Sequence, residues 1–150
     1  MPNTDLQHRV DEWQIAYREF FNGLDTIPFG LRQQPGACGE WNVRQVVAHL
    51  SGWHAIALAE FAMFERGDAA HATLDDDAIN AENVAARAHL DWTQTLAELR
   101  VRLATLADYL DGLIKRGGSD DPRYAQWLQA LGDDARAHMA EIAAWVVAMD

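Results

Sequence analysis

Three side chains, His49, Asp134 and His138, are of types that could together bind a divalent metal. Asp134 and His138 are four residues apart, so on a helix they lie one turn from each other on the same face. If that helix meets the helix that carries His49, two imidazole nitrogens and one carboxylate oxygen converge. Such a set can hold a divalent ion and leave positions open for water or a substrate.

The same residues also have a purely structural interpretation. Asp134 would lie in the first turn of a helix that begins near Asp133, where a negative side chain interacts favourably with the helix dipole. His138 would be a hydrogen-bonded histidine of the core. Spacing alone favours this interpretation over metal binding.

His49 is predicted to lie on a core helix over residues 42–66. Asn42 is suited to the N-cap, because its side-chain oxygen can accept a free backbone N–H of the first turn. His54 falls in the middle of the apolar face and His49 on its flank, so the two imidazoles should point in different directions. The apolar residues recur at steps of three and four, as on one helix face: Val43, Val46, Val47, Leu50, Trp53, Leu58, Phe61 and Phe64.

Apolar stripes elsewhere predict three more long helices, over residues 4–22, 91–116 and 133–148. Asp91 and Gln94 have the spacing of a capping box. A short helix after Pro122 is expected to end at Gly132. A weaker pattern over residues 69–90 predicts a mobile lid or a short helix capped by the acidic run at Asp75. We therefore expect one all-α domain over residues 1–150, an antiparallel up-and-down four-helix bundle with an extra short helix or lid between its second and third helices.

Composition narrows the expected partners. Lys and Arg number 12 against 23 Asp and Glu, for a net charge of -11, and no basic stripe could follow a phosphate backbone. The polar N-terminus has neither a secretory signal nor an apolar run of spanning length. We expect a cytoplasmic protein that binds neither nucleic acid nor membrane.

Cys38 is the only cysteine, which excludes an internal disulfide, and a free thiol is the simplest interpretation of it.

The segment Trp41-Asn-Val-Arg-Gln-Val-Val-Ala-His49-Leu-Ser-Gly-Trp53 resembles the Trp-Ser-Val-Arg-Asp-Val-Leu-Ala-His-Leu signature of the DinB/YfiT-like superfamily of four-helix-bundle proteins. The run Asp-Ala-Ile-Asn80-Ala-Glu-Asn is similar to a segment of proteins in its ClbS/DfsB branch. The resemblance implies a metal-dependent enzyme that hydrolyses a small electrophilic substrate or transfers a low-molecular-weight thiol to it. In the ClbS/DfsB branch the implied alternative is a metal-free protein that binds a small molecule or protects the cell from it.

Family members hold the metal with the histidine of Ala-His-Leu and a His-x-x-x-His pair on the last helix. This resemblance implies His49 as the first ligand and His138 as the last, with Asp134 in place of the middle histidine. Asp is a competent ligand, so a divalent Zn, Ni or Fe ion is expected as cofactor, with a low-molecular-weight thiol as a candidate co-substrate. Under the metal-free alternative, Asp134 marks the loss of the site.

Aromatic residues could line a pocket for a flat apolar substrate, although aromatic residues at helical spacing more often form core. The candidates are Trp41, Trp53, His54 and Trp127, together with Tyr124. His54 could instead be a fourth ligand or a general base, but its place on the apolar face favours a packed core residue.

Two acidic residues, Glu60 and Glu141, could accept hydrogen bonds from the free nitrogens of ligand imidazoles. Exposed charges are the simpler interpretation of both. A homodimer that serves only assembly or regulation is a third functional interpretation of the chain.

Overall fold

The structure is a computed structural model that describes residues 4–68, 74–118 and 120–149. Over these residues the chain forms five α-helices and one short 3-10 helix, with no β-strand, which confirms the expected all-α class. The elements are α1 (Thr4–Asp25), η1 (Phe29–Leu31), α2 (Val43–Glu65), α3 (Asp76–Ala86), α4 (Trp92–Lys115) and α5 (Pro122–Ala148). The short helix expected between the second and third long helices is therefore present as α3, and residues 69–73 of the expected lid lie outside the described part.

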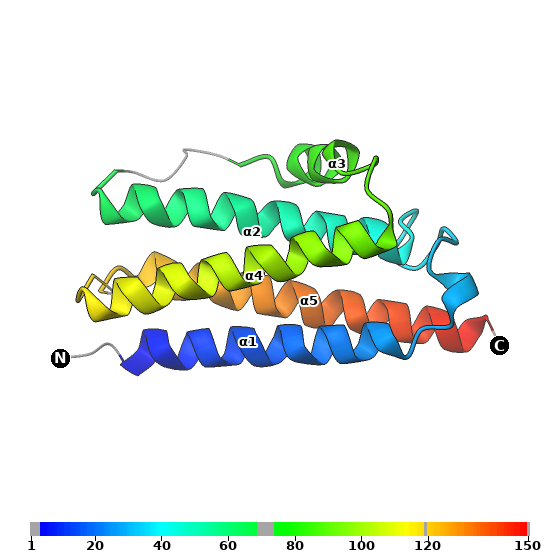
Figure 1. The fold of residues 1–150 in the computed structure, drawn as a ribbon, viewed down its shortest axis with the longest axis horizontal. Coiled ribbons are helices and arrows are strands. Elements are labelled where there is room, and N and C mark those ends of the chain that lie inside the picture. Colours follow the sequence, from blue (N-terminus) through cyan, green and yellow to red (C-terminus); the bar gives the residue numbers. More distant parts are fainter. Residues whose placement is uncertain (1–3, 69–73, 119, 150) are drawn as a thin grey trace.

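The long helices do not alternate in direction. Figure 1 shows α1 and α5 running one way along the molecule, and α2 and α4 running the other way. Contacts agree: Arg116, just after α4, donates to Glu65 at the end of α2, while Arg44 at the start of α2 donates to the carbonyls of Arg87 and Leu90, just before α4. The expected up-and-down order is therefore wrong between α2 and α4, because the segment that contains α3 returns the chain to the end where α2 began.

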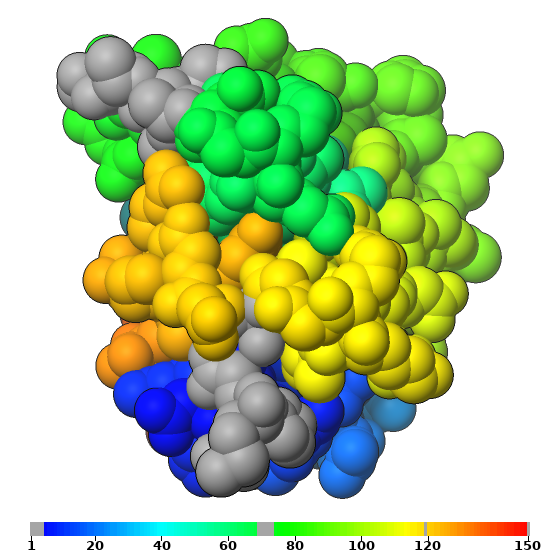
Figure 2. All heavy atoms as spheres, turned by 90° about the vertical axis from the view of Figure 1, so that its left-hand side faces the viewer, coloured from blue at the N-terminus to red at the C-terminus, as the bar shows by residue number. Residues whose placement is uncertain are grey.

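Seen from one end, α2 and α1 lie at opposite corners of the bundle, with the beginning of α5 and the end of α4 on either side between them (Figure 2). Helix α1 packs most extensively on α5, and α2 on α4. Helices α2 and α5 also meet, in opposite directions. This last contact is the one that could bring His49 to Asp134 and His138.

Helix α5 continues through Gly132, which was expected to interrupt it. Gly132 is buried against α1, and a Cβ built on it would lie 3.6 Å from the Ala16 Cβ. That distance is an ordinary van der Waals contact, so a side chain as small as that of Ala would fit there. Glycine at this position costs the helix about 1 kcal/mol relative to Ala but does not end it.

Side-chain caps define where the helices around the site begin. Asn42 accepts the Gln45 N–H at 2.8 Å, and the Gln45 side chain accepts the Asn42 N–H at 2.9 Å, which is a complete capping box. Asp91 and Gln94 make the same pair at α4, as predicted. Asp75 caps α3 through the Ala78 N–H.

Among the described helices, α2 is long and apolar enough to cross a membrane by length and composition. However, 61% of its most apolar window is buried inside the protein. Such burial is typical of the core helix of a soluble protein, and the side chains of Val43, Val46, Val47, Leu50 and Phe61 are completely covered.

Candidate metal centre

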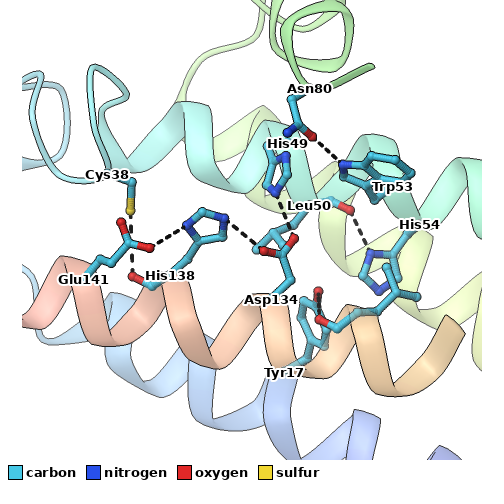
Figure 3. Close-up of polar contacts among 11 residues, drawn as sticks. Tyr17, Cys38, His49, Leu50, Trp53, His54, Asn80, Asp134, His138 and Glu141 are labelled. Atoms are coloured by element: carbon cyan, nitrogen blue, oxygen red, sulfur yellow. Dashed lines mark hydrogen bonds and ion pairs between the residues drawn. The ribbon is translucent and has the colours of Figure 1, made fainter. Parts of the chain in front are cut away.

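The three predicted ligands converge between α2 and α5 (Figure 3). The His49 Nε2 atom lies 2.9 Å from Asp134 Oδ2, and the His138 Nε2 atom lies 3.1 Å from Asp134 Oδ1. One ligand atom of each residue lies within 4.8 Å of the other two. Asp134 does not occupy the first turn of its helix, because α5 begins at Pro122. The structural interpretation of Asp134 as a partner of the helix dipole is therefore wrong.

The arrangement has room for a metal after a small adjustment. Ligand atoms around a tetrahedral ion with bonds of about 2.1 Å are about 3.4 Å apart. The two contacts of Asp134, at 2.9 and 3.1 Å, are shorter by a few tenths of an ångström, which rotation of the side chains can supply. Two nitrogens and one oxygen are a donor set that suits Zn or Fe. The residues present therefore fit the ion that the sequence resemblance implies.

The three side chains are buried to different extents, and the differences show which side of the site is exposed. The side chain of His49 is 5% exposed and that of His138 is 15% exposed, whereas Asp134 is 34% exposed. The Nδ1 atom of His49 is buried without a hydrogen-bond partner. The site therefore opens to its surroundings beside Asp134.

The two imidazoles stabilise the charge of the Asp134 carboxylate, and this carboxylate stabilises a charge on His138. Burial raises the pKa of Asp134, but the hydrogen bonds with His138 and His49 outweigh burial and hold this pKa well below its ordinary value. Burial lowers the pKa of His138, yet its hydrogen bond to Asp134 and the charges of Asp134 and Glu141 raise this pKa above its ordinary value. Without a metal, His138 therefore tends to carry a proton, and an ion that binds there must displace it.

On its other side His138 faces a second group of candidate ligands. The His138 Nδ1 atom lies 3.7 Å from Glu141 Oε1, and the Cys38 Sγ atom lies 3.8 Å from the His138 carbonyl oxygen. Burial, followed by the charge and hydrogen bond of Glu141, raises the pKa of Cys38 to about 12. Cys38 is thus a free thiol that stays protonated near neutral pH. Glu141 is both exposed, as expected, and close to an imidazole.

A cavity of about 690 Å³ lies beside Asp134, between α2, α3 and α5. The rings of Trp53 and Trp127, both predicted as pocket residues, line it with centroids 6.1 Å apart. The Trp53 Nε1–H donates to Asn80 Oδ1 of α3 at 2.6 Å. The complete lining is His49, Trp53, Leu74, Asp76, Asn80, Gln126, Trp127, Ala130, Leu131, Asp133, Asp134 and Ala137.

His54 does not reach this cavity, so its assignment as a pocket residue is wrong. It is 1% exposed, its Nε2 accepts from the Trp13 indole at 3.1 Å, and its Nδ1 donates to the Leu50 carbonyl at 2.8 Å. The Tyr17 ring packs against the imidazole edge-on. Burial lowers the pKa of His54 to about 4, so it is a neutral core residue, which was the favoured interpretation.

Trp41 also lies outside the large cavity. Its ring centroid is 5.0 Å from that of His49 and 6.4 Å from that of His138, so it packs behind the two imidazoles. It lines the smaller hollow next to Cys38 instead. Its assignment to the substrate pocket is therefore corrected to a role in packing the ligand side chains.

Two acidic or polar residues differ from expectation. Glu60 is 1% exposed, so the interpretation as an exposed charge is wrong; it lies on the flank of α2 that other helices cover. Asn80, which holds the Trp53 indole, was not identified from spacing. The available signal was its place in the segment after Asp75, which resembles the ClbS/DfsB branch. This segment forms α3, and α3 packs on α2.

The centre therefore combines a His-Asp-His cluster, an open side at Asp134 and an aromatic cavity next to it. Comparison with known proteins found no matching family model, no matching curated protein and no matching solved structure.

Proposed function

We propose that the protein is a metal-dependent enzyme of the DinB-like four-helix-bundle type. His49, Asp134 and His138 would hold a divalent Zn, Ni or Fe ion, and the reaction would be hydrolysis of a small electrophile or transfer of a low-molecular-weight thiol to it. The observation that carries the proposal is the convergence of three candidate ligand atoms, two of which belong to residues that line a cavity of about 690 Å³, His49 and Asp134. A divalent ion there would lower the pKa of a water or thiol and so supply a nucleophile near neutral pH.

The residues around the centre have separate tasks. Trp53 and Trp127 offer apolar walls that exclude water and hold a flat substrate beside Asp134. Asn80 fixes the Trp53 ring through its hydrogen bond. Trp41 packs against both imidazoles and restricts their rotation. The contacts of Trp41 would thus hold the two imidazoles in position before any ion or substrate arrives.

The first test is the metal content of protein purified without chelator. We expect bound divalent metal in the wild type, and an affinity at least about 100-fold lower in His49→Ala, since even residues that only orient a ligand contribute about 10–100-fold. Affinity should rise with pH, because the ion competes with the proton on His138. His89→Ala, at an exposed position before α4, is the matched control and should keep the metal. Absence of metal from the wild type and the variants alike would reject the proposal.

One observation favours a second function, that of a metal-free small-molecule binder related to the ClbS/DfsB branch. Both Asp134 oxygens already have imidazole partners, so the cluster is electrostatically complete without an ion. Under this function His49→Ala leaves ligand binding nearly intact, whereas Ala130→Trp, which fills the cavity, abolishes it. Under the enzymatic function both variants lose activity.

The proposal includes a cytoplasmic location and a small-molecule substrate. The net charge of -11 supports a partner other than nucleic acid, because a phosphate backbone would be repelled. The burial of α2 inside the protein supports a soluble chain.

A further inference from the structure

The cavity beside Asp134 has an aromatic wall. Trp53 and Trp127 face it from α2 and α5 with an angle of 48° between their planes. Both side chains are half-buried, so part of each indole is available to a ligand. Leu131 adds apolar surface. The two indoles contact each other at a centroid distance of 6.1 Å, so they form one continuous aromatic surface. Such a surface binds planar groups through stacking and edge contacts, and it also attracts cations.

The charges of the lining all have one sign. Asp76 at the start of α3 and Asp133 on α5 are exposed at the opening, and Asp134 lies deeper. Both oxygens of Asp134 already have imidazole partners, whereas the carboxylates of Asp76 and Asp133 are not part of that cluster. Among the described residues that line the cavity there is no Lys or Arg. The opening is therefore negative, and its field adds to that of a chain with net charge -11.

His49 also lines the cavity, but its Nδ1 atom is completely covered and cannot be reached from there. The cavity therefore offers two features to a ligand, an aromatic surface and a negative opening.

We propose that this cavity selects small planar aromatic molecules that carry a positive charge, and that it rejects anionic ones. The ring lies against the surface that Trp53 and Trp127 form, and the cationic group lies at the opening near Asp76 and Asp133. This inference specifies the substrate class and rests on the proposed function of the same cavity. If the reaction is a thiol transfer, it follows that the thiol carries no net negative charge, since free carboxylates on it would meet Asp76 and Asp133.

Three probes of one shape test the charge preference: naphthylmethylammonium, naphthylmethanol and naphthoate. Their dissociation constants are measured by calorimetry with the full-length protein, once after chelator treatment and once after loading with zinc. We expect the ammonium probe to bind about three- to tenfold more tightly than the alcohol, since each exposed ion pair contributes up to about 1 kcal/mol. Naphthoate should bind more weakly than the alcohol after chelator treatment, and the ammonium preference should shrink as salt is added.

Substitutions test whether Asp76 and Asp133 cause the preference for the ammonium probe. Asp76→Asn with Asp133→Asn should bring the affinities of the ammonium and alcohol probes to near equality. The matched control, Asp25→Asn with Asp108→Asn, removes the same charge at exposed positions away from the cavity and should keep the preference. Asp133→Asn alone should give an intermediate ratio, which separates a charge effect from a change in the first turn of α3.

A further variant, Trp127→Ala, should weaken all three probes, whereas Trp145→Ala, elsewhere on α5, should not. Equal affinities in the wild type, an unchanged ratio in the double Asp variant, or no binding of any probe would overturn the inference. The metal content of the same samples reports on the proposed function independently. Charge selection without bound metal would reject the metal centre and leave this inference standing. Bound metal without charge selection would reject this inference and leave the metal centre standing.

Discussion

Helix α2 carries two histidines whose imidazoles meet opposite surroundings. His49 faces the Asp134 carboxylate, whereas His54 is enclosed by Trp13, Tyr17 and the Leu50 carbonyl. The second environment disfavours any positive charge on the imidazole. The burial of His54 should therefore make the stability of the fold depend on pH.

Protonation of His54 should destabilise the fold. Burial lowers the pKa of His54 from 6.5 to about 4, so the unfolded chain binds this proton more readily than the folded one. The contribution of His54 to the free energy of unfolding is fully present above pH 6.5 and falls as pH drops toward 4, by up to about 3 kcal/mol. Urea unfolding at several pH values measures this dependence.

His54→Gln removes the titration and keeps a polar side chain next to Trp13. The variant should be less stable at neutral pH, but its free energy of unfolding should change less than that of the wild type between pH 6.5 and 4. Parallel pH curves for the two proteins would contradict the neutral, buried state of His54.

The charge of Asp134 should set the protonation of His138. In chelator-treated protein, Asp134→Asn removes the hydrogen bond and the charge that raise the pKa of His138, while burial continues to lower it. The titration midpoint of the His138 imidazole, followed by NMR, should therefore move to lower pH. Asp108→Asn, which removes a distant carboxylate, serves as control and should leave the midpoint unchanged. An unchanged midpoint in Asp134→Asn would show that the two side chains do not interact.

At the scale of elements, the packing of α3 on α2 decides whether the cavity is closed on one side. A Cβ built on Gly52 of α2 would overlap the side-chain amide of Asn83 on α3. Only glycine therefore allows α3 to approach this closely. Helix α3 supplies Asn80 and Asp76 to the cavity, so their positions depend on this contact.

Gly52→Ala should displace α3 and lower the free energy of unfolding by about 1–3 kcal/mol, the usual cost of overpacking. Binding of aromatic probes in the cavity should weaken as well. Adding Asn83→Ala removes the overlapping group and should restore much of both properties. The control Gly30→Ala has open space around the new Cβ and should be close to neutral in calorimetric melting and probe titration. A Gly52→Ala protein that melts and binds like the wild type would contradict the close contact.

Most elements were predictable because their signals are local. Caps such as Asn42 and Asp91, together with apolar residues at steps of three and four, locate helix starts and buried faces without any knowledge of partners. The prediction at Gly132 is wrong because a glycine that ends a helix and a glycine that is buried inside a longer helix against its neighbour look identical in sequence. The difference lies in the neighbouring helix, which local patterns do not contain.

Across the whole molecule, the relative directions of the helices were the least predictable feature. Helices α2 and α4 have ordinary amphipathic faces, and nothing in these faces distinguishes parallel from antiparallel neighbours. The direction follows from α3, whose thin apolar content gave only a weak signal of a segment that returns the chain to the start of α2.

The candidate site was predictable in part for the same reason. The spacing of Asp134 and His138 places them on one helix face, and the contact between α2 and α5 adds His49. The burial of Glu60 and the separation of Trp41 from the large cavity depend on how five helices pack, so helical spacing alone could not predict them. The spacing and the family resemblance together thus predicted the cluster of candidate ligands better than the lining of the pocket.

The central claim is that one divalent ion binds between α2 and α5. Anomalous scattering from crystals grown without chelator, recorded on both sides of the absorption edge of the metal found by elemental analysis, tests it most directly. We predict a single peak about 2.1 Å from His49 Nε2, His138 Nε2 and an Asp134 oxygen. A crystal of metal-supplemented protein with no peak there, or with its only peak beside Cys38 and Glu141, would contradict the metal centre.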